Sequence, residues 1–177
     1  MRLRVSRGRL DCAIRFGDGE WPGLDSTLLM QERHIAVAAP SLLDEHAATG
    51  AIDLNRYTLL HVLSGVDQRY LTWQHWLDAA NIEGVNTDGG YEFDLLDYSI
   101  QAAIDGIGIT IADRNMIQPE LASGRLRQVL DVQVDGHQSY WFVLRPARQA
   151  SGAQQKFAAW LQAETAATAT LSASRGV

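Results

Sequence analysis

Apolar residues recur along this chain with two different periods, and each period predicts one kind of element. Residues 10–16 place their larger apolar side chains at every second position, so that Cys12, Ile14 and Phe16 share one face of a predicted strand. Residues 70–81 repeat at helical spacing, with Trp73 and Trp76 on one stripe. We expect both tryptophans in the core or in a dimer contact.

Predicted strands and helices alternate along most of the chain. The strands are residues 10–16, one long or broken strand over 28–31 and 34–39, then 57–62, 85–87, 108–112, 126–130 and 139–144. The helices are residues 41–48, 70–81, 94–105 and 119–123, followed by a last helix that Ser151 opens. Such alternation is typical of an α/β protein.

The helix over residues 94–105 has the best-marked ends. Asp94 is a good N-cap residue, Asp97 adds negative charge to the first turn, and Gly106 stands where a C′ glycine ends a helix. Residues 108–112 follow directly as an apolar strand. The order predicts a crossover of the βαβ kind.

A glycine-rich loop follows the first predicted strand. Gly17 and Gly19 permit a tight turn, and Trp21 with Pro22 stiffens its exit. We expect Trp21 to pack on the turn as a lid. Arg15 is open to two interpretations, a salt bridge to a neighbouring loop or a contact with a ligand carboxylate.

Two segments of this sequence resemble the effector domain of LysR-type transcriptional regulators, in the branch of the glycine-cleavage activators and β-lactamase regulators. The first reads D-x-A-I-R-x-G-D-G-x-W-P-G-L from residue 11, and the second reads F-D-x-L-x-x-x-I-Q-A-A-I-D-G-I-G-I-T from residue 93. The resemblance covers residues 10–164. It implies an α/β fold of two lobes, like a type II periplasmic binding protein, with lobe I incomplete.

The resemblance also implies boundaries. Lobe I would hold residues 10–36 and 135–165, and lobe II residues 37–134. Residues 1–9 form a basic N-terminal arm and residues 166–177 a flexible tail without apolar period. Within lobe I, residues 10–16 should pair antiparallel with the return strand over 139–144.

Two turns are candidates for ligand binding. In open α/β lobes, ligands lie where strand ends meet loops and helix N-termini. The first turn follows the strand over residues 10–16, and the second precedes the helix over residues 94–105. The resemblance places both turns on an inter-lobe cleft and adds an aromatic residue of the return strand. The expected contacts are Phe16, Gly17, Asp18, Phe93, Asp94, Leu95, Leu96 and Tyr140.

The second turn departs from the β-lactamase regulators, which have small hydroxyl residues after the Phe-Asp pair. This chain has Leu95 and Leu96 there. We therefore expect an effector with a more apolar moiety, or a different effector altogether.

Composition argues against several other classes of protein. The 177 residues carry a net charge of −6 and a single cysteine, which exclude an intramolecular disulfide and disfavour phosphate-backbone binding. Motifs for a hydrolase elbow, a metalloprotease or a phosphate loop are absent, and the single lysine, Lys156, makes Schiff-base chemistry improbable. The five histidines lack the spacing of metal ligands. We predict no enzyme, no cofactor, and no catalytic or metal-binding residue.

The expected partner is a small-molecule effector. The intact protein would be a homo-oligomer, a dimer or tetramer, in the bacterial cytoplasm, and would contact DNA only through a helix-turn-helix that we do not find in these residues. No apolar run is long enough to cross a membrane. The alternative is an extracytoplasmic solute-binding protein of a transporter, which shares the lobes but needs a secretion signal, and none is found in residues 1–9.

Overall fold

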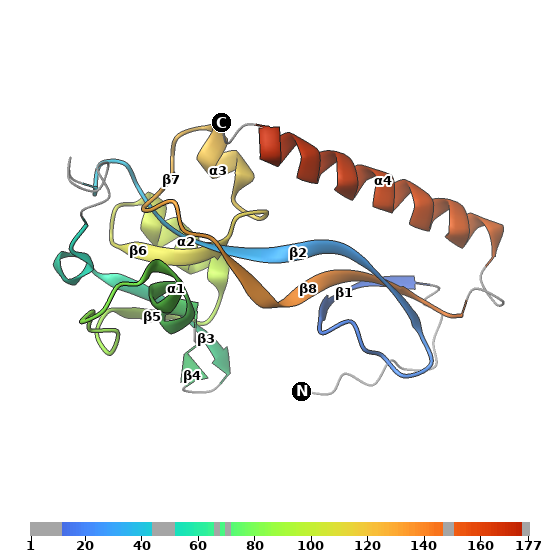
Figure 1. Cartoon of the computed structure of the whole chain (residues 1–177), viewed down its shortest axis with the longest axis horizontal. Coiled ribbons are helices and arrows are strands. Elements are labelled where there is room, and N and C mark those ends of the chain that lie inside the picture. Colours follow the sequence, from blue (N-terminus) through green and yellow to red (C-terminus); the bar gives the residue numbers. More distant parts are fainter. Residues whose placement is uncertain (1–11, 44–51, 66–67, 70–71, 147–150, 175–177) are drawn as a thin grey trace. The chain divides into compact units, whose positions relative to one another are not determined.

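The computed structural model describes residues 12–43, 52–65, 68–69, 72–146 and 151–174 (Figure 1). The chain forms two compact units. Unit 1 comprises residues 1–32 and 137–177, and unit 2 comprises Arg33–Gly136. Two long strands, β2 (Asp25–Ala38) and β8 (Val134–Leu144), contribute residues to both units. We describe each unit separately.

In unit 1, strand β1 (Cys12–Gly17) pairs antiparallel with the second half of β8. The register sets Cys12 opposite Leu144 and Gly17 opposite Ser139, which confirms the pairing predicted for the return strand. Directly opposed residues of an antiparallel pair project from the same face. Ile14 therefore shares a face with Phe142, its partner in the register.

Helix α4 (Gly152–Ser174) belongs to the same unit. The predicted start at Ser151 is confirmed by a reciprocal capping box, in which Gln154 N–H donates to Ser151 Oγ and Ser151 N–H donates to Gln154 Oε1. The Phe157 ring lies 5.8 Å from that of Phe142, between ring centroids. The helix continues to Ser174, into the segment that the sequence predicted as a tail.

Unit 2 is a mixed sheet with helices on both faces. Its elements, besides parts of β2 and β8, are η2 (Leu54–Arg56), β3 (Leu59–Gly65), β4 (Gln68–Arg69), α1 (Thr72–Ala80), β5 (Tyr91–Phe93), α2 (Leu96–Ile104), β6 (Ile109–Asp113), α3 (Gln118–Ala122) and β7 (Arg127–Gln128). The sheet runs in the order β2-β6-β3-β4, with β5 paired to β3 and β7 to β2. Strand β3 is parallel to both β5 and β6, so the chain from β5 through α2 to β6 makes the predicted crossover.

Alternation along the central strands produces the two cores of unit 2. On β2, Ala36 and Ala38 join one cluster, whereas Ile35 and Val37 join the other. The first cluster contains Trp73 and Trp76 of α1, and the second contains Ala102 and Ala103 of α2. Both tryptophans are buried, which agrees with the first of the two predicted alternatives, a place in the core.

Two glycines flank β3 where the backbone approaches closely. A Cβ on Gly90, whose φ is 101°, would lie 2.0 Å from the carbonyl oxygen of Leu59. A Cβ on Gly108 would lie 2.2 Å from the carbonyl oxygen of Thr58. No side chain fits at either position, because real Cβ contacts do not approach so closely.

Three local predictions need correction or stay open. Residues 85–87 do not form a strand; the strand that precedes α2 and pairs with β3 is β5, which the sequence did not suggest because Tyr91 and Glu92 are exposed and the strand is only three residues long. Asp94 is not the N-cap of α2. The predicted helix over residues 41–48 lies mostly outside the described residues, and residues 41–43 form a turn.

The cap of α2 falls one residue later than predicted. Leu95 is the N-cap, with extended φ and ψ of −129° and 139°, and its side chain makes no cap hydrogen bond. Asp94 and Leu95 together turn the chain out of β5, so Asp94 stands too early to cap. The predicted end is confirmed, because Gly106 has a φ of 76° directly after the C-cap Asp105.

Candidate functional site

An aromatic pair marks the end of the β1–β8 ladder in unit 1. Phe16 and Tyr140 are opposed in the register, and their ring centroids lie 4.9 Å apart. Phe16 remains 41% exposed, although its ring packs against Tyr140. Two predicted contact residues that are far apart in sequence therefore form one partly exposed aromatic surface.

The glycine turn follows Phe16 directly. Gly17 is buried and Asp18 is exposed. The Asp18 carboxylate accepts a hydrogen bond from Glu20 N–H at 3.0 Å, which closes an Asx-type turn. Ser26 Oγ donates to the Gly19 carbonyl oxygen at 2.6 Å. The turn is thus held by hydrogen bonds from its own residues and from β2.

Trp21 packs on this turn, as predicted. A Cβ on Gly17 would meet the Trp21 ring at 3.0 Å. The Arg15 guanidinium lies over the same ring, 5.0 Å from its centroid. Arg15 thus makes a cation–π contact, which neither sequence interpretation of this residue anticipated.

The second candidate turn lies in unit 2, between β5 and α2. Phe93 ends β5 and packs partly against the α2 side of the core, and Leu96 opens the helix. Between them, Asp94 and Leu95 are exposed, Leu95 by 55%. The helix therefore begins without a hydrogen bond from its N-cap side chain to the first amides, next to an exposed apolar side chain.

The eight predicted contact residues fall into two groups. Four lie together in unit 1, and four lie together in unit 2. The predicted cleft to which both groups would contribute stays a prediction.

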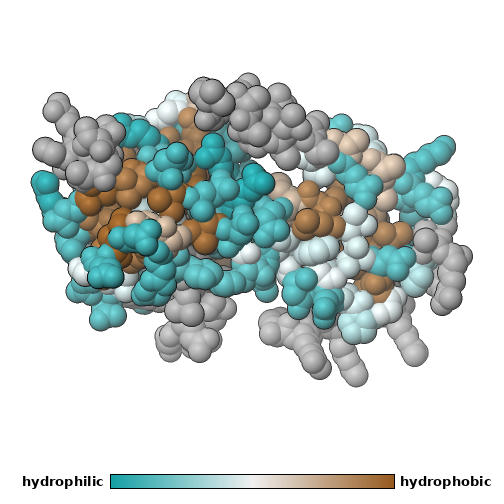
Figure 2. Space-filling model, in the orientation of Figure 1, coloured by the Kyte–Doolittle hydropathy of each residue, from teal (hydrophilic) through white to brown (hydrophobic). Residues whose placement is uncertain are grey.

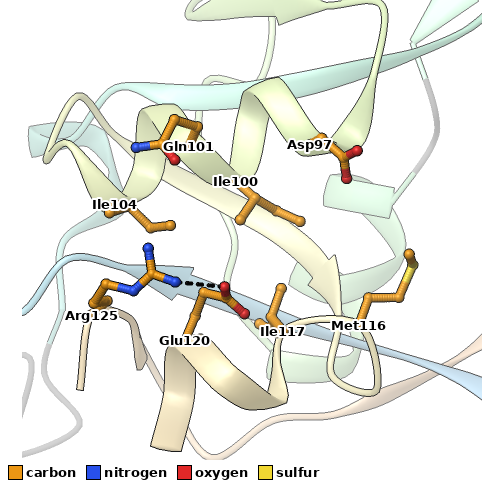
Figure 3. A pocket seen from close by; sticks show the side chains of 8 residues that line it. All are labelled: Asp97, Ile100, Gln101, Ile104, Met116, Ile117, Glu120 and Arg125. Atoms are coloured by element: carbon orange, nitrogen blue, oxygen red, sulfur yellow. Dashed lines mark hydrogen bonds and ion pairs between the residues drawn. The ribbon is translucent and has the colours of Figure 1, made fainter. Parts of the chain in front are cut away.

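Unit 2 also has a pocket of about 280 Å³ that the sequence did not suggest (Figure 3). Its apolar side chains come from α2 and from the segment around α3: Ile100, Ile104, Met116 and Ile117. Arg125 and Glu120 form an ion pair of 2.8 Å at its edge. None of the eight predicted contact residues lines it. The pocket is lined by residues from two segments, around 97–104 and around 116–125. No local sequence pattern predicts that these two segments pack together.

Among the residues that the structure describes, large exposed apolar side chains occur in both units, and Figure 2 shows hydrophobic side chains at the surface among hydrophilic ones. In unit 1 the large ones are Ile14, Phe16, Leu28, Phe157 and Trp160. In unit 2 they are Tyr91, Leu95, Tyr98, Ile107 and Met116. Phe16 and Leu95 thus belong to the exposed apolar surface of their units.

Within the described residues, no group of three or more histidine, cysteine, aspartate or glutamate side chains is arranged to hold a metal ion. Nor does any helix in the described part of the chain have the length and apolar character needed to cross a membrane.

Comparison with known proteins identifies the family. The LysR substrate binding domain matches residues 1–166, so the chain belongs to this family of effector-binding domains of LysR-type regulators. Its fold is that of these domains, which resemble type II periplasmic binding proteins. The resemblance noted in the sequence is confirmed.

Two regulators are among the relatives. The chain is 29% identical over 152 residues to the glycine cleavage system transcriptional activator homolog of Haemophilus influenzae, covering 86% of this chain and 49% of that protein. It is 33% identical over 155 residues to the HTH-type transcriptional regulator DsdC of Escherichia coli, covering 83% of this chain and 48% of that protein. The chain spans about half the length of these relatives.

Solved structures agree. The effector domain of the transcriptional regulator AmpR of Pseudomonas aeruginosa superposes with a TM-score of 0.72 at 28% identity, covering 91% of this chain and 74% of that one. The effector-binding domain of AmpR from Citrobacter freundii superposes with a TM-score of 0.68 at 25% identity, covering 88% and 74%. These relatives are bacterial transcriptional regulators rather than enzymes, and the alternative of a transporter's solute-binding protein is not favoured.

Proposed function

We propose that this chain senses a small molecule and that the aromatic pair of unit 1 and the β5–α2 turn of unit 2 both contact it. Units 1 and 2 would then be the two lobes of the domain, joined by β2 and β8. The observation that carries the proposal is the pairing of Phe16 with Tyr140 beside the glycine turn, because it gathers two distant segments of predicted contact residues at one place in unit 1.

We infer that, in the whole protein, ligand binding favours one arrangement of the lobes and thereby regulates transcription. The whole protein would be a homo-oligomer that acts on DNA in the cytoplasm. The names of the relatives, which describe transcriptional regulators, support this. Coupling requires that the effector bind one arrangement more tightly than the other.

The β5–α2 turn supports a statement about the class of effector. Helix amides that the N-cap side chain leaves unbonded attract an acceptor or an anionic group, and the exposed Leu95 side chain favours an apolar group beside it. We propose an effector that combines a carboxylate with an apolar moiety. An amino acid larger than glycine, or its N-acetyl derivative, has both.

Thermal unfolding of the full chain tests this directly. We expect leucine, phenylalanine or their N-acetyl derivatives to raise the melting temperature and glycine to leave it unchanged. A compound at about 100 times its Kd stabilises the folded state by about 2.7 kcal/mol. If no compound of this set raises the melting temperature, the proposed class of effector is wrong.

Variants then assign the contacts. Tyr140→Phe and Leu95→Ser should weaken binding of the compound that stabilises the wild type, and Leu95→Ser should weaken it more for the larger apolar side chains. Tyr98→Phe is the matched control, because Tyr98 is an exposed tyrosine of α2 outside the predicted contacts. Equal effects of Tyr98→Phe and Tyr140→Phe would contradict the assignment.

A further inference from the structure

Strand alternation divides the residues around the glycine turn into two sets. Phe16 and Tyr140 are opposed in the β1–β8 ladder and project from one face, whereas their neighbours Arg15 and Trp141 are opposed and project from the other. The first pair belongs to the predicted contacts. The second pair has no role in the function proposed above.

Trp141 holds the start of the turn by a hydrogen bond. Its indole Nε1–H donates to the carbonyl oxygen of Gly17 at 3.0 Å, across 124 positions of the chain. An indole N–H has no acceptor capacity and one fixed direction, so this bond sets where the Gly17 carbonyl points. The Trp141 side chain is half-buried.

The same indole also fixes the middle of the turn. Gly19 has a φ of 91°, and a Cβ at this position would lie 2.6 to 2.9 Å from three atoms of the Trp141 ring. The Gly19 backbone therefore lies directly against the ring. Gly19 is required here twice, for its backbone conformation and for its lack of a side chain.

A second indole contacts the turn. Trp21 lies against Gly17, and Arg15 stacks on Trp21. These contacts use the Arg15 face of the ladder and leave the Phe16–Tyr140 face to other partners. The turn is thus supported by side chains on the face of the ladder opposite to Phe16 and Tyr140.

We propose that Trp141 is a positioning residue for effector binding: it fixes the backbone of the turn over residues 17–19 and so presents Phe16, Gly17 and Asp18 in their binding conformation. This inference rests on the proposed function. Trp141 does not contact the effector itself. A turn that is already ordered loses less conformational entropy on binding, so loss of this support weakens affinity.

Trp141→Phe tests the hydrogen bond in the full chain, because phenylalanine keeps an aromatic ring and removes the N–H. We expect amide hydrogen exchange of residues 18–20 to become about fivefold faster, the size of one lost net hydrogen bond. Trp160→Phe is the matched control, because Trp160 is 54% exposed on α4, and it should change exchange in the turn by less than about twofold. Unchanged exchange in Trp141→Phe overturns the proposal.

A double-mutant cycle tests the contact with Gly19. Gly19→Ala should speed exchange in the turn by about tenfold in the wild type, through backbone strain and the clash with the Trp141 ring. Phenylalanine at position 141 has fewer ring atoms near Gly19. In the Trp141→Phe background, Gly19→Ala should therefore speed exchange in the turn by about threefold or less. Independent effects of the two substitutions would show that Trp141 and Gly19 do not act as one unit.

Binding separates the inference from the function on which it rests. With N-acetyl-leucine as the probe, we expect Trp141→Phe to raise Kd about fivefold and Trp160→Phe to leave it unchanged. Faster exchange with an unchanged Kd overturns the positioning role and leaves the proposed function standing. Suppose instead that Trp141→Phe speeds exchange but the wild type binds none of the compounds above. Trp141 then still holds the turn, and the proposed class of effector is wrong.

Discussion

Strand β2 enters both units, and its apolar residues meet opposite environments in them. Ile35 and Val37, in unit 2, are fully buried, whereas Leu28, in unit 1, is 45% exposed. The same contrast holds elsewhere: in the described part of the chain, both hydrophobic clusters lie in unit 2, while Ile14 of unit 1 is 58% exposed. One strand thus serves as the centre of a core in one unit and as a partly exposed surface in the other.

This contrast suggests a division of labour. Burial of apolar area is the main source of folding free energy, so unit 2 should supply most of the cooperative stability. The described part of unit 1 offers exposed aromatic side chains beside a tightly held turn. Exposed apolar groups favour association with a partner or a ligand rather than stability.

The largest difference between the units is expected when a tryptophan in each unit is replaced by alanine. Trp76 is fully buried and its Nε1–H donates to the Val132 carbonyl oxygen at 3.2 Å. We expect Trp76→Ala to lower the free energy of unfolding by about 3–5 kcal/mol, through lost burial and a cavity. Urea denaturation measures it. Trp160→Ala, in unit 1, should cost less than about 1 kcal/mol, and similar losses in both variants would remove the contrast.

A smaller effect is expected from buried and exposed carboxylates. Asp113 is 2% exposed, and its Oδ1 accepts hydrogen bonds from Arg33 N–H, Asn115 N–H and Asn115 Nδ2. Asp113→Ala leaves these donors without that acceptor and should cost about 2–4 kcal/mol.

The control for Asp113→Ala is Asp18→Ala, since Asp18 also accepts a local backbone N–H but is exposed. We expect a cost below about 1 kcal/mol, because water replaces the lost acceptor. Asp113→Asn keeps an acceptor oxygen, so its loss of unfolding free energy should lie between those of Asp113→Ala and Asp18→Ala. A larger loss for Asp18→Ala than for Asp113→Ala would contradict the burial argument.

Amide hydrogen exchange compares the units without any substitution. Amides of β3 and β6 should exchange about 30-fold more slowly than those of β1, equivalent to about 2 kcal/mol of extra opening free energy. Mass spectrometry of the full chain measures both sets at once. Equal protection of β1 and β6 would mean that the exposed apolar side chains of unit 1 do not limit its stability.

The smallest expected effect concerns the start of α2. Because Leu95 and not Asp94 is the N-cap, Asp94→Ala should change the free energy of unfolding by less than about 0.5 kcal/mol. Leu95→Ser supplies the missing cap and should stabilise the protein by about 0.5–1 kcal/mol. Thermal or urea unfolding separates the two. Destabilisation by Asp94→Ala of more than about 1 kcal/mol would restore the capping role that the sequence suggested.

Local patterns in the sequence predicted most elements of the fold. Period-two spacing located β1, helical spacing located α1, and the end signal at Gly106 correctly placed the end of α2. Strand β5 was missed because two of its three residues are exposed and it has no apolar period. The cap at Asp94 was wrong because residue preference does not fix how many residues the chain needs to leave a strand.

The candidate site was predictable in part. The motifs identified the two turns, and the strand pairing of β1 with β8 was expected, but the contact between Phe16 and Tyr140 that follows from its register was not. The support of the turn was not predictable, because the Trp141 to Gly17 hydrogen bond joins residues 124 positions apart and a tryptophan in a strand gives no sign of its partner. The pocket beside Arg125 was missed for the same reason.

The close approaches at Gly90 and Gly108 constrain how this chain can vary in evolution. A side chain at either position would overlap a carbonyl oxygen of the segment beside it, whatever effector the protein senses. In a saturation library selected only for folding, these two codons should therefore accept almost no replacement, whereas the codon for Leu95 should vary freely. Positions that diverge between relatives while both glycines persist would then mark where the family changes its chemical specificity.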